Sequence, residues 1–423
     1  MNRTWYKNID WSTMLAWSGL VAVGLTAIYS ATHGPASEFL LDSVQRNFDR
    51  QFTWFAISAV AFFVILLIPA RFWDRVSYPA YAVVIALLVA TLLFGRVVNG
   101  AKAWLYVGPF GLQTAELAKI GTLMAVAKFL ASKQARTGRL RYTLVAVGIV
   151  LLPVVIIIAQ NETGTALIFL AMIPFVLFWG GVPLSLMALM VAPAVAGYLA
   201  VVQNDAAFPL YVLIFALLFT AAILATTRDK WWSAAAFAFT GVFGIAAWLG
   251  LTQILKPHQV SRIIAFTNPE AFASTTGYHV IQSKAAIGSG GLLGKGYMQG
   301  TQTQLAFIPE QSTDFIFTVI GEEFGFLGTM TVLALFGYLL IRLASLGSWA
   351  AHTFIKVFAA GVAGIFLTHV IINVGMTIGV VPVIGIPLPL VSYGGSALLA
   401  NTILVAMAVN LYARRDEFSI YRS

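Results

Sequence analysis

The strongest candidate for chemistry in this sequence is one carboxylate, Asp314, at the end of a long polar and glycine-rich stretch. The stretch runs from Ser261 to Gly325, and the next apolar run begins inside it, at Phe315. Loops longer than about 15 residues within a compact domain are usually functional or disordered. This one contains apolar and aromatic residues such as Tyr278, which predict a folded loop. An acid beneath a folded loop, at the start of an apolar run, is a candidate functional site.

Two further carboxylates, Glu322 and Glu323, follow Asp314 within the apolar run. Ionisable side chains inside a membrane span are expensive to bury and indicate function by default. At about 100° per residue, Glu322 lies nearer than Glu323 to the helix face of Asp314, so the two glutamates are expected to act differently. One of them is expected to pair with Lys119. The structural alternative is that Asp314 only caps the helix that follows it.

Composition identifies the class of protein that positions these acids. Hydrophobic residues make up 60% of the chain and charged residues 10%, whereas soluble domains are about half apolar and about a quarter charged. This predicts an all-α polytopic membrane protein. The absence of cysteine excludes disulfides, thiol nucleophiles and zinc–thiolate sites. The net charge of +9 is typical of basic cytoplasmic loops, so no nucleic-acid partner is predicted.

Apolar runs that can cross about 30 Å of hydrocarbon predict roughly 12 helices in a single integral membrane domain, residues 1–423. The predicted spans are 11–31, 51–69, 78–95, 114–131, 142–160, 164–181, 184–203, 208–226, 232–254, 315–341, 354–378 and 390–412. The pair within residues 208–254 has no acid or base inside its spans and is interpreted as scaffold or as a lipid-facing addition. Residues 255–314 form the long loop.

Basic residues predict the orientation of these spans. The segments that join the spans on the side of the N-terminus contain most of the Lys and Arg residues. The short segments on the other side contain only Arg46, Arg50, Arg96 and Lys102. Cytoplasmic segments carry the excess of Lys and Arg, so the long loop and Asp314 are predicted to face away from the cytoplasm.

Other polar groups are expected near the same outer side. Glu116 and Lys119 lie three residues apart on one face of a helix, for which Thr114 is the predicted N-cap. They form either a structural ion pair or part of a substrate cavity. Glu162, in a turn between two spans, is either a helix-capping carboxylate or a functional group.

The last third of the chain is predicted to form a second wall of the site. Asn373 is followed by a segment rich in proline and glycine, residues 380–398. Irregular backbone at membrane depth is tolerated only where it is buried in protein or lines a cavity. Ser392, Tyr393 and Ser396 are expected to face that cavity.

Four segments resemble the SEDS family of cell-wall polymerases. They are GYHVIQSKAAIGSGGLLGKG, GTQTQLAFIPEQSTDFIF, GEEFGFLG and NVGMTIGVVPVIGIPLPLVSYGGSALL. The resemblance covers nearly the whole chain, and the form IPLPLVSYGGSALL is nearer to the RodA branch than to the FtsW branch. Three positions depart from the family pattern, at Ala103, at Thr114–Ala115 and at Asn161–Glu162. The family has ten spans, so the pair within 208–254 is interpreted as an insertion.

The resemblance implies a peptidoglycan glycosyltransferase that polymerises lipid II into β-1,4 glycan strands during cell elongation. The key acid of the family corresponds to Asp314, which would act as general base in an inverting displacement of undecaprenyl pyrophosphate. Substrate-binding residues are expected at Lys102, Arg262, Gln282, Ser283, Lys284, Lys295, Thr313, Ser392 and Tyr393. Intramembrane polar residues with structural roles are expected at Glu116, Lys119, Glu322, Glu323 and Asn373.

The family also implies a location and partners. The chain is expected as a multi-pass protein of the bacterial cytoplasmic membrane with its active site on the extracytoplasmic face. Its expected partners are a class B penicillin-binding protein, lipid II and membrane lipid. No resident cofactor is implied, and a divalent cation at the departing pyrophosphate is left open. The alternatives are a flippase for lipid-linked precursors, the division paralogue FtsW, or a scaffold that needs no acid.

Overall fold

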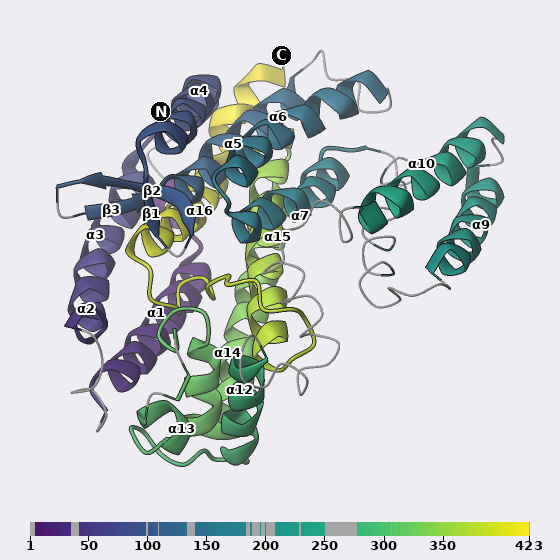
Figure 1. The fold of residues 1–423 in the computed structure, drawn as a ribbon. Coiled ribbons are helices and arrows are strands. Elements are labelled where there is room, and N and C mark those ends of the chain that lie inside the picture. The colour runs from purple at the N-terminus through teal and green to yellow at the C-terminus, as the bar shows by residue number, and fades with distance from the viewer. Residues whose placement is uncertain are drawn as a thin grey trace.

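The chain folds into a bundle of long helices, seen in a computed structural model (Figure 1). The structure describes residues 5–34, 42–98, 100–108, 110–132, 140–182, 187, 195, 199, 208–227, 230–249, 277–305, 307–308 and 310–422. The long helices of the bundle are α1 (Trp11–Thr32), α3 (Asn47–Leu67), α4 (Ala70–Phe94), α5 (Thr114–Ala131), α6 (Leu140–Ala159), α7 (Thr163–Trp179), α14 (Ile316–Trp349), α15 (Thr353–Thr377) and α16 (Gly395–Ala413). Short helices are η1 (Trp5–Asn8), α2 (Asp42–Gln45), α12 (Tyr278–Ser289), α13 (Thr301–Gln304) and η5 (Arg415–Arg422).

Among the described helices, seven are long and apolar enough to cross a membrane, and they belong to α1, α3, α4, α6, α14, α15 and α16. The predicted class, an all-α polytopic membrane protein, is confirmed. The count of 12 spans stays a prediction, because the predicted span 184–203 lies almost entirely outside the described residues. The boundaries that differ clearly from the predicted ones are the start of α4 at Ala70, the end of α14 at Trp349 and the start of α16 at Gly395.

Helices α15 and α16 form the centre of the bundle. They are the most enclosed of the seven candidate spans, with 72% and 78% of their most apolar windows buried. Helices α3 and α5 pack against α16, and α7 and α14 pack against α15. A helix that is apolar all round is stable in such a position because other helices or lipid cover every face.

The two chain termini lie at one end of the bundle, here called the terminal end (Figure 1). Contacts between the N- and C-terminal segments hold this end together. The guanidinium of Arg414 lies 3.9 Å from the ring centroid of Trp5, and the side-chain amide of Asn410 binds carbonyls at the end of α3. Helices α12 and α13 lie at the opposite end, here called the Asp314 end.

Residues 96–113 form a small antiparallel sheet, which the sequence did not predict. Its strands are β1 (Arg96–Val98), β2 (Ala101–Val107) and β3 (Phe110–Gln113), in the order β1-β2-β3. Trp104 pairs with Gln113 and Tyr106 with Gly111. Aromatic and β-branched residues favour a pleated strand, and this explains why the segment is not irregular. Gln113 takes the N-cap position of α5, so the prediction of Thr114 as N-cap was wrong.

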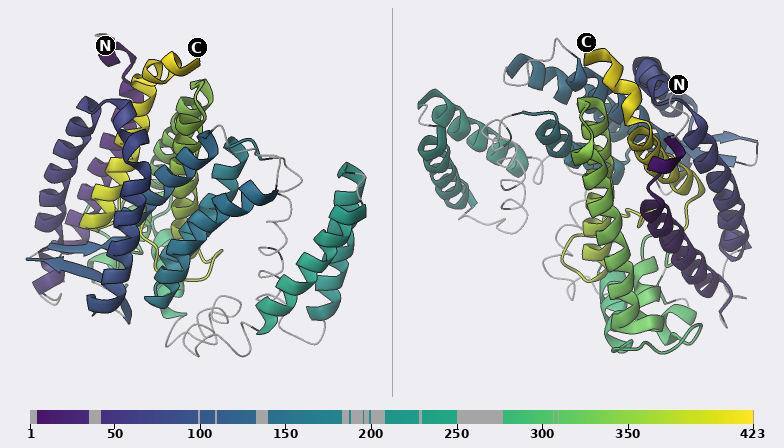
Figure 2. Two further views of the ribbon diagram at one scale, coloured as in Figure 1. Left: turned by 90° about the horizontal axis from the view of Figure 1, so that it is seen from above. Right: turned by 180° about the vertical axis from the view of Figure 1, so that it is seen from behind.

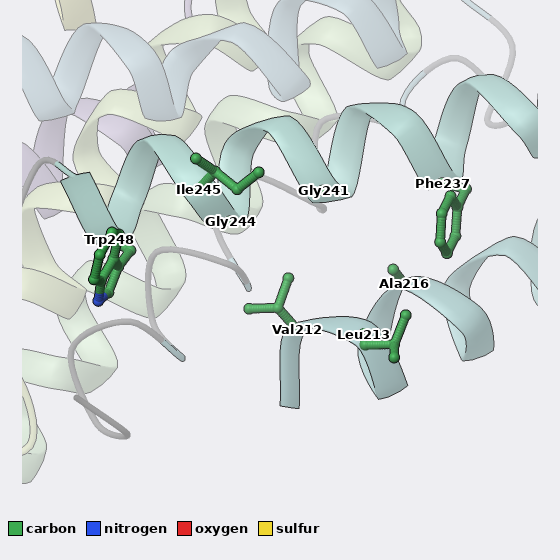
Figure 3. Close-up of a pocket in the computed structure, with 8 residues that line it drawn as sticks. All are labelled: Val212, Leu213, Ala216, Phe237, Gly241, Gly244, Ile245 and Trp248. Atoms are coloured by element: carbon green, nitrogen blue, oxygen red, sulfur yellow. The ribbon is translucent and has the colours of Figure 1, made fainter. Parts of the chain in front are cut away.

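Helices α9 (Phe208–Thr227) and α10 (Lys230–Leu249) pack against each other and lie at the side of the bundle (Figure 2). They fall within the predicted helix pair, residues 208–254, whose last residues lie outside the described part. Apolar side chains of both helices and two glycines of α10 line a cavity of about 300 Å³ between them (Figure 3). Its lining residues are Val212, Leu213, Ala216, Phe237, Gly241, Gly244, Ile245 and Trp248.

The long loop predicted at residues 255–314 is helical in part from Tyr278 onward, where α12 and α13 form. Residues 255–276 of this loop lie outside the described part. Helix α14, which follows, is broken at Gly325, where φ is 64° and ψ is −157°. Only glycine adopts such a conformation without strain, so the first turns of α14 take a direction different from the rest.

Candidate functional site

Asp314 lies in a tight turn directly before α14. The carbonyl of Glu310 accepts hydrogen bonds from the amides of Thr313, Asp314 and Phe315, at 3.2, 3.1 and 3.3 Å. Glu310 itself has a left-handed backbone with φ of 54°. Phe315, not Asp314, takes the N-cap position of α14, so the alternative that Asp314 is only the helix cap is wrong. The Asp314 side chain is half-buried at this site.

Three consecutive carbonyls around Asp314 are held by the C-terminal third of the chain. The Ser312 carbonyl accepts the amide of Tyr393 at 2.8 Å, and the Thr313 carbonyl accepts the hydroxyl of Ser392 at 2.5 Å. The Asp314 carbonyl accepts the side-chain amide of Asn373 at 2.8 Å. Each bond removes freedom from the backbone that carries the acid. The predicted second wall therefore contacts the Asp314 turn directly.

The carboxylate of Asp314 lies beside the segment between α15 and α16. A β-carbon placed on Gly385 would lie 3.2 Å from Asp314 Oδ2, and Gly385 has a left-handed φ of 79°. Both features require glycine at this position. On either side of it, Ile384 and Ile386 lie against Gly164 at the start of α7. Residues 384–386, here called the Gly385 segment, thus separate the acid from α7.

Helix α12 covers another side of the site. The Ser283 hydroxyl is buried, lies 2.6 Å from the Thr318 hydroxyl and donates to the Thr377 carbonyl at 2.8 Å. A small apolar cluster, Ala286, Ile308 and Phe315 with Val383 packed on it, joins α12 to the acid's turn and the approach to the Gly385 segment. Ser283 is therefore engaged between helices in this structure, and we leave it out of the proposed substrate contacts.

The predicted basic residues differ in what their ammonium groups contact. Lys102 donates to the Leu93 carbonyl at 2.8 Å. Lys295 donates to Glu322 at 2.6 Å and to Thr301 at 2.7 Å. Lys284 is exposed on α12, beside Gly379, and makes no ion pair within the described part of the chain. Arg262 lies outside the described residues. Among the described members of the predicted basic set, Lys284 is thus the exposed cation that makes no ion pair.

The other predicted polar residues lie around the same turn. The Thr313 hydroxyl donates within the turn, to the Glu310 carboxylate at 2.9 Å. Gln282 is half-buried on α12, next to Ser283. Ser392 accepts from the Leu388 amide at 2.8 Å in addition to its bond to Thr313, so its hydroxyl fixes main chain on both sides.

Glu116 and Lys119 form a buried ion pair at 2.9 Å. The ammonium of Lys119 also lies 3.2 Å from Nε2 of His369 on α15, and Nδ1 of His369 lies 3.0 Å from the Pro387 carbonyl. A carbonyl only accepts, so Nδ1 carries the proton and Nε2 accepts from Lys119. A line of polar groups therefore runs from α5 through α15 to the neighbourhood of the Gly385 segment.

The expectation that Glu322 or Glu323 pairs with Lys119 was wrong. Glu322 is fully buried and accepts from Lys295, from the Thr301 hydroxyl, from the amides of Gln302 and Thr303 and from the Thr303 hydroxyl, at 2.6 to 3.2 Å. Glu323 accepts from Ser30 at 2.6 Å and from Gln304 at 2.7 Å. The two glutamates do act differently: one caps α13, and the other joins α13 to α1.

Glu162 takes the N-cap position of α7, but its carboxylate accepts from side chains, namely from Gln113 and, at 3.1 Å, from Thr165. Burial raises the pKa of Glu162 to about 7, although the hydrogen bond from Thr165 acts in the opposite direction. Desolvation disfavours the charged form of a carboxyl group. Glu162 thus combines a capping position with an unusual proton affinity, so both earlier interpretations keep support.

Sequence reasoning missed two residues that shape the site. His369 was not considered, although an ionisable residue in an apolar span is itself a signal. Gln51 is buried on α3, donates to the Ser392 carbonyl at 3.3 Å and accepts the Gly394 amide at 3.0 Å. No pattern in the sequence pairs Gln51 with that segment. Within the described residues, no cluster of three His, Asp or Glu side chains is arranged to hold a metal ion.

Comparisons with known proteins identify the family of the chain. The sequence pattern of the FtsW, RodA and SpoVE family, described as cell cycle proteins, matches residues 10–203 and 185–417. The chain is 34% identical to the peptidoglycan glycosyltransferase RodA of Treponema pallidum (strain Nichols), over 97% of this chain and 98% of that protein. It is 33% identical to the peptidoglycan glycosyltransferase MrdB of Escherichia coli (strain K12), over 88% and 87%.

A solved structure of a peptidoglycan synthase complex that coordinates polymerization and crosslinking contains a similar chain. That chain is 26% identical, covers 98% of this one and is itself covered to 99%, with a TM-score of 0.70. The fold of the described residues therefore resembles an experimental one.

Proposed function

Because the chain belongs to the FtsW, RodA and SpoVE family, we propose that it is a peptidoglycan glycosyltransferase that polymerises lipid II with Asp314 as general base. The observation that carries this proposal is the placement of Asp314: its main chain is tied at three consecutive carbonyls while its carboxylate faces the Gly385 segment. A catalytic base must be held in a defined geometry to reach the proton it removes.

The proposed reaction is a single displacement. A hydroxyl oxygen of the acceptor sugar attacks the anomeric carbon of the donor and forms the new glycosidic bond. The bond between that carbon and the undecaprenyl pyrophosphate breaks, and its electron pair leaves with the pyrophosphate. The proton of the hydroxyl passes to the Asp314 carboxylate. One displacement converts the α-linked donor into a β-1,4 product, so the mechanism needs no covalent intermediate.

The departing pyrophosphate requires positive charge close to the acid. We assign this contact first to Lys284, which is exposed on α12 and lies beside Gly379, just beyond the end of α15. A cation that stabilises the leaving group acts where negative charge develops. The further proposed contacts are Lys102, Arg262, Gln282, Lys295, Thr313, Ser392 and Tyr393. A divalent cation would supply the same charge.

The proposal includes an orientation and a partner. The Asp314 end faces the extracytoplasmic side of the bacterial cytoplasmic membrane, as the distribution of Lys and Arg predicts. The partner is a class B penicillin-binding protein, and the resemblance to one chain of a peptidoglycan synthase complex supports this choice. The relatives named RodA and MrdB favour the elongation branch over the division branch.

The test is polymerisation of lipid II by the chain reconstituted in lipid vesicles with its transpeptidase partner. Asp314→Asn should lower kcat by about 10³-fold, the range of general acid–base catalysis, while the amount of folded protein is unchanged. The matched control is Asp49→Asn, because Asp49 is an exposed acid in the first turn of α3. An Asp314→Asn protein that still makes glycan strands would remove the acid from the mechanism.

The same vesicles distinguish a polymerase from a flippase. A flippase would move labelled lipid II across the bilayer without elongating it, and Asp314→Asn would leave that movement intact. A polymerase produces strands that gel electrophoresis resolves. Strand formation by the wild type together with its loss in Asp314→Asn is the expected result.

A further inference from the structure

We propose that Asn373 is a positioning residue for Asp314, and that its side-chain amide sets the separation between the acid and the opposite wall of the site. The inference rests on the proposed function, since it concerns a reaction in which Asp314 takes the proton. It concerns a residue that touches neither the proton nor the carboxylate in the contacts described above.

The geometry of the amide is specific. Asn373 Nδ2 donates to the Asp314 carbonyl and to the Ile386 carbonyl, both at 2.8 Å. An amide nitrogen has two hydrogens, and both partners are oxygens that only accept, so the nitrogen must face them. One side chain therefore joins the main chain of the acid to the main chain of the Gly385 segment.

These two bonds lie on either side of the place where Gly385 approaches the Asp314 carboxylate. Gly385, next to Ile386, is the residue whose β-carbon would lie 3.2 Å from Asp314 Oδ2. The distance between the carboxylate and this wall therefore follows from the bridge at Asn373. A reacting group that shifts by about 1 Å can lose about 10²-fold in rate, so the bridge has a large effect on chemistry without contacting the substrate.

Asn410 provides a comparison within the same molecule. It is as buried as Asn373, and its Nδ2 also binds main-chain carbonyls, those of Ile65, Leu66 and Ile68. Its Oδ1 accepts from the indole of Trp73 at 3.1 Å. Asn410 thus uses both ends of its amide, and it does so at the terminal end, away from Asp314.

Asn373 uses only one end of its amide. Its Oδ1 is buried and has no hydrogen-bond partner within the described part of the chain. A buried polar atom without a partner lowers stability, so packing alone is a poor reason for asparagine at this position. The two bonds donated by Nδ2 are what the side chain contributes.

The test compares the same substitution at both positions, Asn373→Asp and Asn410→Asp. Each replacement keeps the shape of the side chain but exchanges the donating nitrogen Nδ2 for a carboxylate oxygen, which then lies against the main-chain carbonyls that Nδ2 had bound. The full chain is reconstituted with its transpeptidase partner, and kcat and KM for lipid II are measured per folded protein. Asn373→Asp should lower kcat by about 10²-fold at nearly unchanged KM. Asn410→Asp should lower thermal stability and leave kcat per folded protein unchanged.

Two outcomes would overturn the inference. One is a wild-type kcat in folded Asn373→Asp, and the other is the same loss of kcat in both variants. If Asn373→Asp does not fold, Asn373→Ser is measured instead, because its hydroxyl can donate only one of the two bonds; a wild-type kcat in that protein overturns the inference as well. An inactive Asp314→Asn beside a fully active Asn373→Asp refutes the positioning role alone. An active Asp314→Asn refutes the proposed base, and the positioning role with it.

Discussion

Two carboxylates near the start of α14, Asp314 and Glu322, are built in opposite ways. Glu322 is fully buried, and its oxygens accept from five donors of the preceding loop. Asp314 is half-buried, and the bonds described here hold its main chain, from Ser312 to Asp314 itself. At Glu322 the described bonds converge on the carboxylate. At Asp314 three bonds fix the main chain that carries the carboxylate.

The difference teaches how a membrane protein can use acids for two purposes within three turns of chain. Hydrogen-bond donors around a carboxylate stabilise its charged form, so such a carboxylate is a poor proton acceptor. A carboxylate whose backbone is fixed from behind can face a substrate. Glu322 is therefore expected to affect stability, whereas Asp314 is expected to affect turnover.

For Glu322, the largest loss of stability is expected from Glu322→Gln. The change leaves the ammonium of Lys295 without its charged partner and turns an amide group toward backbone N–H donors. Removing one member of a buried pair costs about 3 kcal/mol or more, to be measured by denaturant titration in mixed micelles. The control is Glu310→Gln, since Glu310 is exposed and should change stability by at most about 0.5 kcal/mol. Unchanged stability with lost turnover would make Glu322 part of the chemistry.

On the Asp314 side, Gly385→Ala should lower kcat by about 10²-fold, because the added carbon displaces the carboxylate and strains a left-handed backbone. The measurement is the rate of lipid II polymerisation per folded protein. Gly241→Ala is the control, since a β-carbon at Gly241 meets no atom within 4 Å. Equal activity of the two alanine variants would mean that the Gly385 segment does not fix the acid.

A smaller effect is expected from Lys284→Ala, which removes the exposed cation of α12 that we assign to the pyrophosphate and leaves the backbone bonds of the Asp314 turn intact. We expect a loss of about 10-fold in kcat/KM, comparable to one charge-assisted hydrogen bond. Lys284→Arg keeps the charge and should recover most of the loss. If Lys284→Ala and Lys284→Arg have the same activity, the pyrophosphate contact belongs to another cation.

A further effect, on the pH dependence of stability and not on turnover, is expected at Glu162, the acid with the raised pKa. Its folded-state pKa of about 7 lies above the ordinary value of 4.5, so the folded protein holds a proton that the unfolded chain releases. The stability that this proton contributes is fully present below about pH 4.5 and is lost as pH rises through about 7. The midpoint temperature of thermal unfolding should therefore fall more steeply between about pH 5 and about pH 8 in the wild type than in Glu162→Gln. Equal slopes would contradict the assignment.

Much of the architecture could be predicted from the sequence because apolar runs identify membrane helices directly. The starts of α1, α5 and α14 were predicted within a residue or two. The sheet at residues 96–113 was missed. Glycine between residues that favour strands also predicts a hairpin, and the apolar composition of the region obscured that signal.

The candidate site was predictable in its residue types and unpredictable in its pairs. Asp314 and Asn373 were each selected as polar residues at membrane depth, but nothing in the chain relates an amide to a carbonyl 59 residues away. The expected pairing of Lys119 with Glu322 or Glu323 failed for the same reason. Helical angles place a residue on a face, whereas the neighbour that meets this face is decided by how the helices pack. The ion pair of Lys119 with Glu116, three residues away on the same helix, was predicted as one alternative, but the contact with His369 of α15 was not.

The three carbonyl ties of the Asp314 turn come from residues that follow it in the chain, at 373, 392 and 393. The position of Asp314 therefore does not depend on the length of the loop that precedes it. Insertions or deletions upstream of Glu310 can change what covers the Asp314 turn without displacing the proposed base.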